Sequence, residues 1–243
     1  MPVAIITGAS RGLGRALALE LAARGWDLVV DGRNAAALRS VAAELTAAAR
    51  ARDLPAPVDR GPVEALPGDV TDSAHRAALV AAALALGGVD LLVNNASALG
   101  AEPLVPLARL SEAGWREALE TNVVAPFALV RAALPALRAA GGAVLNVSSD
   151  AAVAAYPTWG GYGAAKAALD HGSAVLAAEE PRLRVWWVDP GELRTDLYAA
   201  AVPGDPGFAD RLLPAEVGPA FVRLLDERPP SGRYVARALL GAR

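Results

Sequence analysis

The sequence predicts an α/β protein with a doubly wound, mostly parallel sheet of seven strands and helices on both faces, the Rossmann-type arrangement. Short, continuously apolar segments alternate with longer segments of helical periodicity along the chain, which is typical of a parallel sheet covered on both faces. A glycine-rich turn joins the first apolar segment to the first helical one. Polar motifs follow the carboxyl ends of the apolar segments, where such sheets bind their ligands.

Strand and helix signals recur in order through the first half of the chain. Residues 3–6 form an apolar run that stops at Thr7-Gly8, and Leu13, Leu17 and Leu21 then repeat at helical spacing. By the same reasoning we expect strands at 3–6, 28–30, 63–66 and 89–93 and helices at 13–24, 35–51 and 73–86. Three prolines within 53–62 predict a loop there.

The second half continues the alternation. A long helix is expected over 111–139, with kinks at Pro126 and Pro135. We expect strands at 143–147, 183–188 and 234–239, helices at 161–178 and 215–227, and a loop rich in glycine and proline at 196–214. The sequence shows no internal repeat, so we expect a single domain over residues 1–243.

Composition excludes several classes of function. The 243 residues carry a net charge of −3 without a cluster of basic residues, so we expect no nucleic-acid or anionic membrane partner. The chain has no cysteine and only two histidines, His75 and His171, which argues against a metal site or a catalytic triad. The N-terminus lacks the features of a signal peptide. These observations predict a soluble, cytoplasmic protein.

The turn after the first strand has the features of a phosphate-binding loop. Glycine allows the backbone to turn tightly and approach a pyrophosphate closely, and the following helix offers unpaired N–H groups. The spacing G-x-x-x-G-x-G differs from the usual G-x-G-x-x-G, but its position between strand and helix favours phosphate binding. The residues assigned to this loop are Gly8, Ser10, Arg11, Gly12, Leu13 and Gly14.

Charge at the end of the second strand favours NADP over NAD. An NAD site places an acid there to hold the ribose, whereas an NADP site places cations for the 2′-phosphate. Counted from Gly25, that acidic position falls on Gly32, and Arg33 follows it. Arg11 projects from the glycine loop toward the same region, so we predict NADPH as the cofactor. The alternatives are that both arginines are merely solvated, or that Asp31 dominates and selects NADH.

Tyr162 and Lys166 are the candidate catalytic pair. They lie four residues apart, on one face of a predicted helix. A nearby cation favours the phenolate and lowers the pKa of a tyrosine, which allows the phenol to exchange a proton with an alcohol or alkoxide. Ser149, thirteen residues before Tyr162 at a strand end, is placed to hydrogen-bond a substrate oxygen.

These motifs together resemble the short-chain dehydrogenase/reductase family over essentially the whole chain. The residues that carry the resemblance are Thr7 to Gly14, Asp69, Asn94-Asn95-Ala96, Asn122, Ser149, Tyr162 with Lys166, and Pro190-Gly191 with Thr195. Two departures are visible. The loop between the second helix and the third strand is longer than is typical and rich in proline, and Ser97 stands where the family usually has a glycine. We expect the change to serine to matter little.

The resemblance implies a role for each matching residue. Tyr162 is expected to be the acid/base, Lys166 to lower its pKa and bind the nicotinamide ribose, and Ser149 to orient the carbonyl. Asn122 is expected to hold a water in a proton relay. The remaining residues expected to bind the cofactor are Asp69 and Val70 at the adenine, Asn95 and Ala96 near the ribose, and Pro190, Gly191 and Thr195 at the nicotinamide.

The predicted function is therefore an NADPH-dependent interconversion of a carbonyl and an alcohol. A non-catalytic NADP-binding sensor or regulator on the same fold is the main alternative, and an epimerase or dehydratase is another. By resemblance, the segment 196–214 covers the substrate, and its mixed apolar character suggests a medium-sized, partly apolar small molecule. Trp159 either lines this pocket or packs. The resemblance also implies a homodimer or homotetramer that pairs through the 111–139 helix and the Tyr162 helix.

Overall fold

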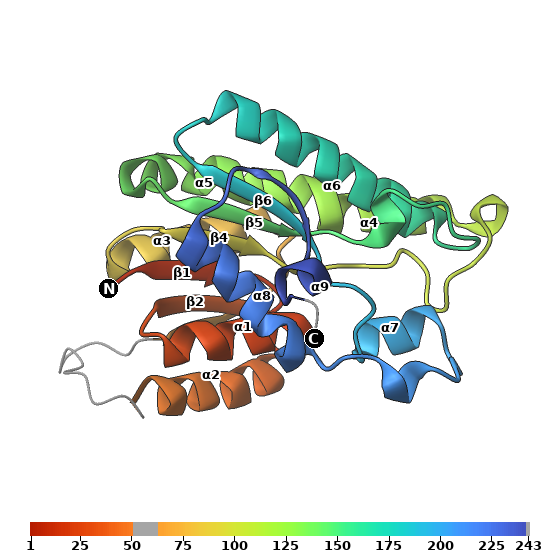
Figure 1. Ribbon diagram of the computed structural model, residues 1–243, viewed down its shortest axis with the longest axis horizontal. Helices are drawn as coiled ribbons and strands as arrows, with labels where there is room; N and C mark the ends of the chain where they lie inside the picture. The colour runs from red at the N-terminus through yellow and green to blue at the C-terminus, as the bar shows by residue number, and fades with distance from the viewer. Residues whose placement is uncertain (51–62, 242–243) are drawn as a thin grey trace.

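A seven-stranded parallel sheet with the order β3-β2-β1-β4-β5-β6-β7 forms the centre of the computed structural model. Figure 1 shows helices on both sides of this sheet. The structure describes residues 1–50 and 63–241. The strands are β1 (Val3–Ile6), β2 (Asp27–Gly32), β3 (Val63–Pro67), β4 (Leu91–Asn94), β5 (Ala143–Val147), β6 (Arg184–Asp189) and β7 (Gly232–Val235). The strand order reverses between β1 and β4, which opens a crevice at their carboxyl ends. The predicted fold class is confirmed.

Helices cover the sheet on both faces, and alternate residues of each strand point to opposite cores. In β1, Ala4 and Ile6 contribute to one apolar cluster, whereas Val3 and Ile5 contribute to the other. The first cluster includes residues of α1 (Gly12–Ala23), α2 (Ala35–Arg50) and α8 (Pro214–Glu227). The second includes residues of α3 (Ser73–Leu86) and α5 (Ala125–Ala140), and partly buried residues of α6 (Gly160–Glu179) pack against it. This double burial explains why the strands are continuously apolar.

The predicted 111–139 helix is interrupted by a π-helical turn. The segment consists of α4 (Glu112–Leu119), the turn η2 (Glu120–Val124) and α5. Pro126 has no N–H to continue the helical ladder to the carbonyl of Asn122, and the N–H of Ala125 donates to the carbonyl of Glu120 instead. Pro135 lies inside α5 without ending it. By length and composition the whole segment is also apolar enough to cross a membrane, but Leu129 and Leu137 are buried in the core.

Two C-terminal predictions are wrong in detail. The segment 196–214 is not only a loop, because it contains α7 (Asp196–Ala201), capped by the Thr195 hydroxyl, and the short 3-10 helix η4 (Phe208–Asp210). The predicted strand at 234–239 ends early, since its last pair is Asp189 with Val235, where β6 itself ends. The chain then forms α9 (Ala236–Leu239). The predicted loop at 53–62 lies outside the described residues.

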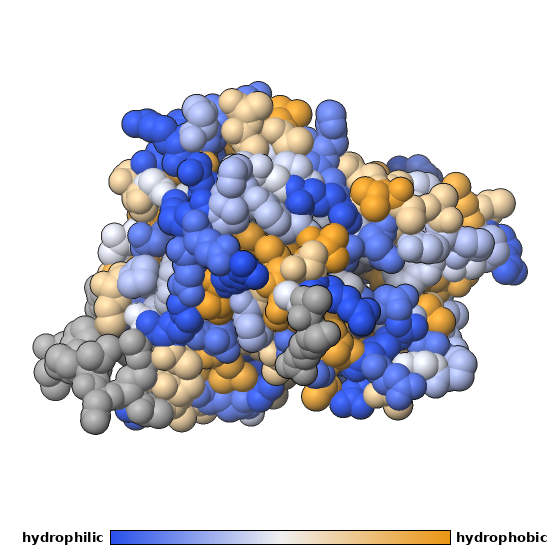
Figure 2. Space-filling model, in the orientation of Figure 1, coloured by the Kyte–Doolittle hydropathy of each residue, from blue (hydrophilic) through white to orange (hydrophobic). Residues whose placement is uncertain are grey.

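Hydrophilic side chains predominate on the face that carries α8 (Figure 2).

Candidate active site

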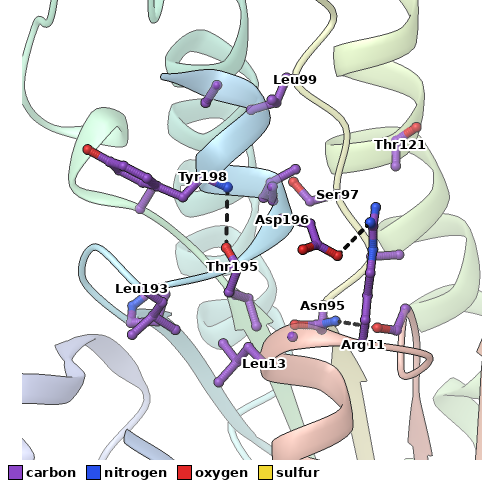
Figure 3. A pocket seen from close by; sticks show the side chains of 18 of the residues that line it. Arg11, Leu13, Asn95, Ser97, Leu99, Thr121, Leu193, Thr195, Asp196 and Tyr198 are labelled. Carbon is purple, nitrogen blue, oxygen red and sulfur yellow. Dashed lines mark hydrogen bonds and ion pairs between the residues drawn. The ribbon is translucent and has the colours of Figure 1, made fainter. Parts of the chain in front are cut away.

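A cavity of about 810 Å³ lies at the carboxyl ends of the strands and reaches from the β1–α1 turn to α7. This volume is in the range of natural cofactor and substrate sites. Every catalytic and cofactor-binding residue predicted above lines the cavity, except Gly14 and Asn122. Figure 3 shows part of the lining, with Leu13 below Thr195 and Tyr198, and with the Arg11 side chain directed up toward Asp196.

The glycine loop approaches its surroundings so closely that side chains are excluded. Gly8 and Gly12 have φ angles of +66° and +57°, a conformation that favours glycine. A Cβ atom on Gly14 would lie 2.5 Å from the carbonyl oxygen of Gly8, whereas one on Gly12 would meet nothing closer than 3.6 Å, at Thr195. Arg11 precedes α1 without a side-chain capping bond. The N-terminus of α1 thus has room beside it for a pyrophosphate, and the chain fits a dinucleotide.

Asn95 supports the glycine loop from the neighbouring strand. Its side-chain amide donates to the carbonyl of Thr7 at 2.9 Å and to that of Gly8 at 3.1 Å, and its backbone N–H donates to the Thr7 hydroxyl. The resemblance implied a place for Asn95 near the ribose. The structure places it on the cavity wall with its amide donors directed to the loop.

Asp31 is directed toward the glycine loop. Its carboxylate accepts the N–H of Gly8 at 2.6 Å and lies 3.2 Å from Nε2 of His75, and its side chain is almost wholly buried. The sequence offered no signal for the role of His75, which lies 44 residues away in α3. With both carboxylate oxygens engaged, Asp31 differs from the ribose-binding acid of an NAD site.

The two arginines predicted to read the 2′-phosphate occupy different parts of the cavity wall. Arg33 is exposed at the end of β2, beside Asp69. Burial acts to raise the pKa of Asp69, but hydrogen bonds from Thr71 and the charge of Arg33 outweigh it and lower that pKa. Arg11 instead forms a 2.9 Å ion pair with Asp196 at the start of α7 (Figure 3). Both arginines line the cavity, and Arg11 is the one that forms an ion pair across it.

Three of the candidate catalytic residues, Ser149, Tyr162 and Lys166, line the cavity together. Tyr162 and Lys166 lie on α6, and Ser149 follows β5. The ammonium group of Lys166 lies 5.5 Å from the ring centroid of Tyr162 and donates to the carbonyl of Val147 at 2.7 Å. Ser149 caps the next turn by accepting the N–H of Ala151 at 3.1 Å. The arrangement brings a phenol, a hydroxyl and an ammonium group to one wall.

Burial dominates the pKa values of both helix residues. Burial raises the pKa of Tyr162 to about 12, although hydrogen bonding to Ser97 and Ser149 lowers it. The sequence argument that a cation lowers this pKa is therefore outweighed. Burial also lowers the pKa of Lys166 to about 8, against the charge of Asp170, which raises it. At neutral pH Tyr162 is thus a protonated phenol, ready to donate.

Ser97 contributes more than its place in the sequence suggested. Its hydroxyl donates to Oδ1 of Asn122 at 2.6 Å and also hydrogen-bonds Tyr162. The side chain of Asn122 is buried and donates to the carbonyls of Ala98 and Ala118, both at 2.7 Å. Asn122 therefore fixes the loop that carries Ser97, from behind the cavity wall. The sequence signal was present, because a serine stood where the family has a glycine.

Arg233 of β7 joins the strand ends behind the site. Its guanidinium donates to Asp170 at 3.1 Å and to the carbonyl of Ser149 at 2.9 Å, and it lies 3.5 Å from Asp189. The other oxygen of Asp170 accepts the hydroxyl of Ser148. This network connects the ends of β5 and β6 with α6. No motif marked Arg233, Asp170 or Asp189, and Arg233 lies 84 positions from Ser149.

Comparisons with known proteins agree with this geometry. The chain matches the family described as short chain dehydrogenase over residues 2–205. It is 30% identical to the oxidoreductase YciK of Escherichia coli over 236 residues, which cover 95% of this chain and 89% of the relative.

Two solved structures are similar throughout. An alcohol dehydrogenase of the archaeon Thermococcus sibiricus, complexed with 5-hydroxy-NADP, has a TM-score of 0.83 and 28% identity over 97% of this chain and 95% of that one. A short chain dehydrogenase of Shigella flexneri, complexed with NADP, has a TM-score of 0.85 and 28% identity over 97% of each chain.

Proposed function

Because the chain belongs to the short-chain dehydrogenase family, we propose that this oxidoreductase uses NADPH to interconvert a carbonyl and an alcohol, with Tyr162 as the acid/base. The observation that carries the proposal is the buried phenol of Tyr162 beside Ser149 and Lys166, on the wall of the same cavity as the glycine loop. A group that donates a proton and a loop shaped for a pyrophosphate thus share one site.

Different residues of the cavity are assigned to different parts of the dinucleotide. The N–H groups at the start of α1 are suited to the pyrophosphate, and Arg33 is the exposed cation for the 2′-phosphate. Pro190, Gly191 and Thr195 line the same cavity and are assigned to the nicotinamide by the family resemblance. NADP in the similar Shigella structure supports this assignment. When bound, the nicotinamide supplies or accepts the hydride.

Tyr162 and the side chains around it carry out the proton transfer to the substrate. Since burial raises the pKa of Tyr162 to about 12, the phenol holds its proton at neutral pH and donates it to the carbonyl oxygen as charge develops there. Ser149 offers a second hydrogen bond to the same oxygen. Lys166, with a pKa of about 8, is mostly cationic at pH 7 and favours the phenolate that remains.

A paired titration tests the cofactor assignment. The protein is titrated with NADPH and separately with NADH, followed by nicotinamide fluorescence. We expect NADPH to bind at least tenfold more tightly, equivalent to about 1.4 kcal/mol. Tighter binding of NADH would contradict the assignment of Arg33 and return Asp31 to consideration.

A panel of carbonyl compounds then tests the reaction. We expect NADPH-dependent reduction that is lost in Tyr162→Phe, while the affinity of that variant for NADPH stays near the wild-type value. Tight NADPH binding without turnover of any carbonyl would instead favour a non-catalytic sensor or regulator. Near-normal turnover in Tyr162→Phe would remove that residue from the proton step.

A further inference from the structure

Four aromatic side chains form a row that starts at the proton donor. The ring centroid of Tyr162 is 5.6 Å from that of Trp159 in an edge-to-face arrangement, and Trp159 is 6.5 Å from Tyr198. Tyr198 stacks with Phe208 at 6.3 Å. The chain has only five tryptophans, four tyrosines and three phenylalanines. All three aromatic ring pairs found among residues 1–50 and 63–241 belong to this row.

The row forms part of the cavity wall. Trp159, Tyr162 and Tyr198 all line the cavity, as does Tyr156. Trp159 and Tyr198 are only half-buried, which leaves part of each ring accessible. The neighbouring positions in the lining are aliphatic, namely Leu99, Leu197, Ala201 and Val202. This end of the cavity therefore offers apolar and aromatic surface beside the phenol of Tyr162.

The cations near this wall are engaged with other groups. Arg211 stacks over the ring of Tyr198 at 4.1 Å and pairs with Glu192 and Asp205. Arg11 pairs with Asp196, and the ammonium of Lys166 donates to a backbone carbonyl. The lining here also includes the acids Asp150 and Glu192. An anionic substrate would thus face the carboxylate of Asp150, since that of Glu192 is paired with Arg211. It would meet no cation without a partner in the described part of this wall.

We propose that the enzyme reduces neutral aryl ketones and aldehydes, in which the aromatic ring is bonded directly to the carbonyl carbon. The ring centroids of Trp159 and Tyr162 lie 5.6 Å apart. A substrate whose aromatic ring packs on Trp159 therefore places its carbonyl group beside the phenol of Tyr162. This inference rests on the proposed function. The carbonyl carbon gains a hydride from NADPH and the oxygen gains the proton of Tyr162, which yields the alcohol and NADP⁺.

Matched substrates separate aromatic recognition from size. With NADPH and the full chain, kcat/KM is compared for acetophenone and cyclohexyl methyl ketone, which have the same number of heavy atoms. Aromatic contacts contribute about 0.5–1.5 kcal/mol beyond burial, or about 2- to 12-fold. We expect a preference of this size for acetophenone. We expect the preference to disappear in Trp159→Leu and to survive in Trp159→Phe and in the remote control Trp26→Leu.

A second pair tests charge. Methyl 4-acetylbenzoate is expected to be reduced at least tenfold more efficiently than 4-acetylbenzoate, because the carboxylate of the latter faces that of Asp150 in the wall. Equal use of acetophenone and its cyclohexyl analogue, or a preference for the anion, would overturn the proposal.

Binding of unreactive analogues keeps this result distinct from the reaction itself. The affinities of benzamide and cyclohexanecarboxamide for the NADP⁺ complex are measured by calorimetry. If benzamide binds more tightly than cyclohexanecarboxamide and this preference is lost in Trp159→Leu, the aromatic site is supported. If, in addition, no ketone is reduced, only the proposed function is contradicted. Equal binding of the two amides would overturn the aromatic site alone.

Discussion

At the scale of single residues, the protonation state of Tyr162 results from a balance between burial and hydrogen bonds. Burial raises the pKa of Tyr162 to about 12, and the hydroxyls of Ser97 and Ser149 act in the opposite direction. A phenol in this environment is an acid at neutral pH and becomes a base only under alkaline conditions. The two directions of the reaction should therefore depend differently on pH.

We expect alcohol oxidation with NADP⁺ to accelerate with pH, by up to tenfold per unit between pH 7 and 10, since the phenolate fraction grows by that factor below the pKa. Carbonyl reduction should stay nearly constant from pH 6 to 7.5, because Tyr162 remains protonated and Lys166, with a pKa of about 8, remains mostly charged. Initial rates of both reactions at saturating cofactor test this prediction. Oxidation that is flat or slower at higher pH would contradict it.

Arg33 and Arg11 provide a matched pair for cofactor choice. We expect Arg33→Ala to weaken NADPH binding at least tenfold and NADH binding much less, because the exposed guanidinium at the end of β2 is the one assigned to the 2′-phosphate. Arg11→Ala should change the ratio of the NADPH and NADH affinities little, since Arg11 pairs with Asp196. Equal losses for both cofactors in Arg33→Ala, measured by fluorescence titration, would contradict the assignment.

At the scale of elements, α6 positions the catalytic residues through a close approach to the turn after β5. Gly163 directly follows Tyr162, and a Cβ atom there would lie 2.6 Å from the carbonyl oxygen of Ala151. Arg233 holds the same turn from the other side, through the carbonyl of Ser149. The distance between Tyr162 and Ser149 thus depends on the absence of a side chain at position 163.

We expect Gly163→Ala to lower kcat and the melting temperature, because the clash is with backbone and forces α6 away from the turn, at a cost of about 1–3 kcal/mol. Gly218→Ala is the matched control, since Gly218 lies inside α8 with nothing within 4 Å of the added Cβ. That control should be as active as the wild type and slightly more stable, by up to about 1 kcal/mol. Unchanged activity in Gly163→Ala would contradict the prediction, because it would mean that α6 can shift without moving the catalytic residues out of place.

At the scale of the whole molecule, the outer faces of α6 and the 112–140 segment expose apolar side chains. Val124 and Val175 are 49% and 43% exposed. On α6, Ala164, Ala168, Ala174 and Ala178 are exposed as well. Small exposed residues allow a second helix to approach closely, and apolar patches of this kind often mark interfaces between subunits. The homo-oligomer implied by the family resemblance has a suitable surface here.

We expect light scattering to show a dimer or tetramer that Val175→Glu converts toward the monomer, because a buried unpaired carboxylate destabilises an interface. Leu84→Glu on α3 is the control, since Leu84 is 54% exposed on a different helix and should leave the mass unchanged. A monomeric wild-type protein would contradict the prediction, as would an oligomer that tolerates Val175→Glu.

Sequence alone was enough to predict the order of the seven strands and of the long helices, although not α7 or α9, together with the glycine loop and the position of Ser149, Tyr162 and Lys166. These features depend on local patterns, because burial on both faces makes strands apolar and residues four apart share a helix face. The fold class then brings the strand ends together at one edge of the sheet. Even the π-helical turn has a local cause in Pro126, although its type was not predicted.

The partners of charged and buried side chains were decided only by the tertiary structure. Arg11 meets Asp196 across 185 positions, and Arg233 meets Ser149 across 84. Ser97 and Asn122 contact each other although 25 residues separate them. Burial, which outweighs the neighbouring groups in setting the pKa of Tyr162, is likewise a property of the assembled core. The fold class places these strand ends at one edge of the sheet, but which side chains pair there depends on the conformations of the loops, which no periodicity or spacing in the chain encodes.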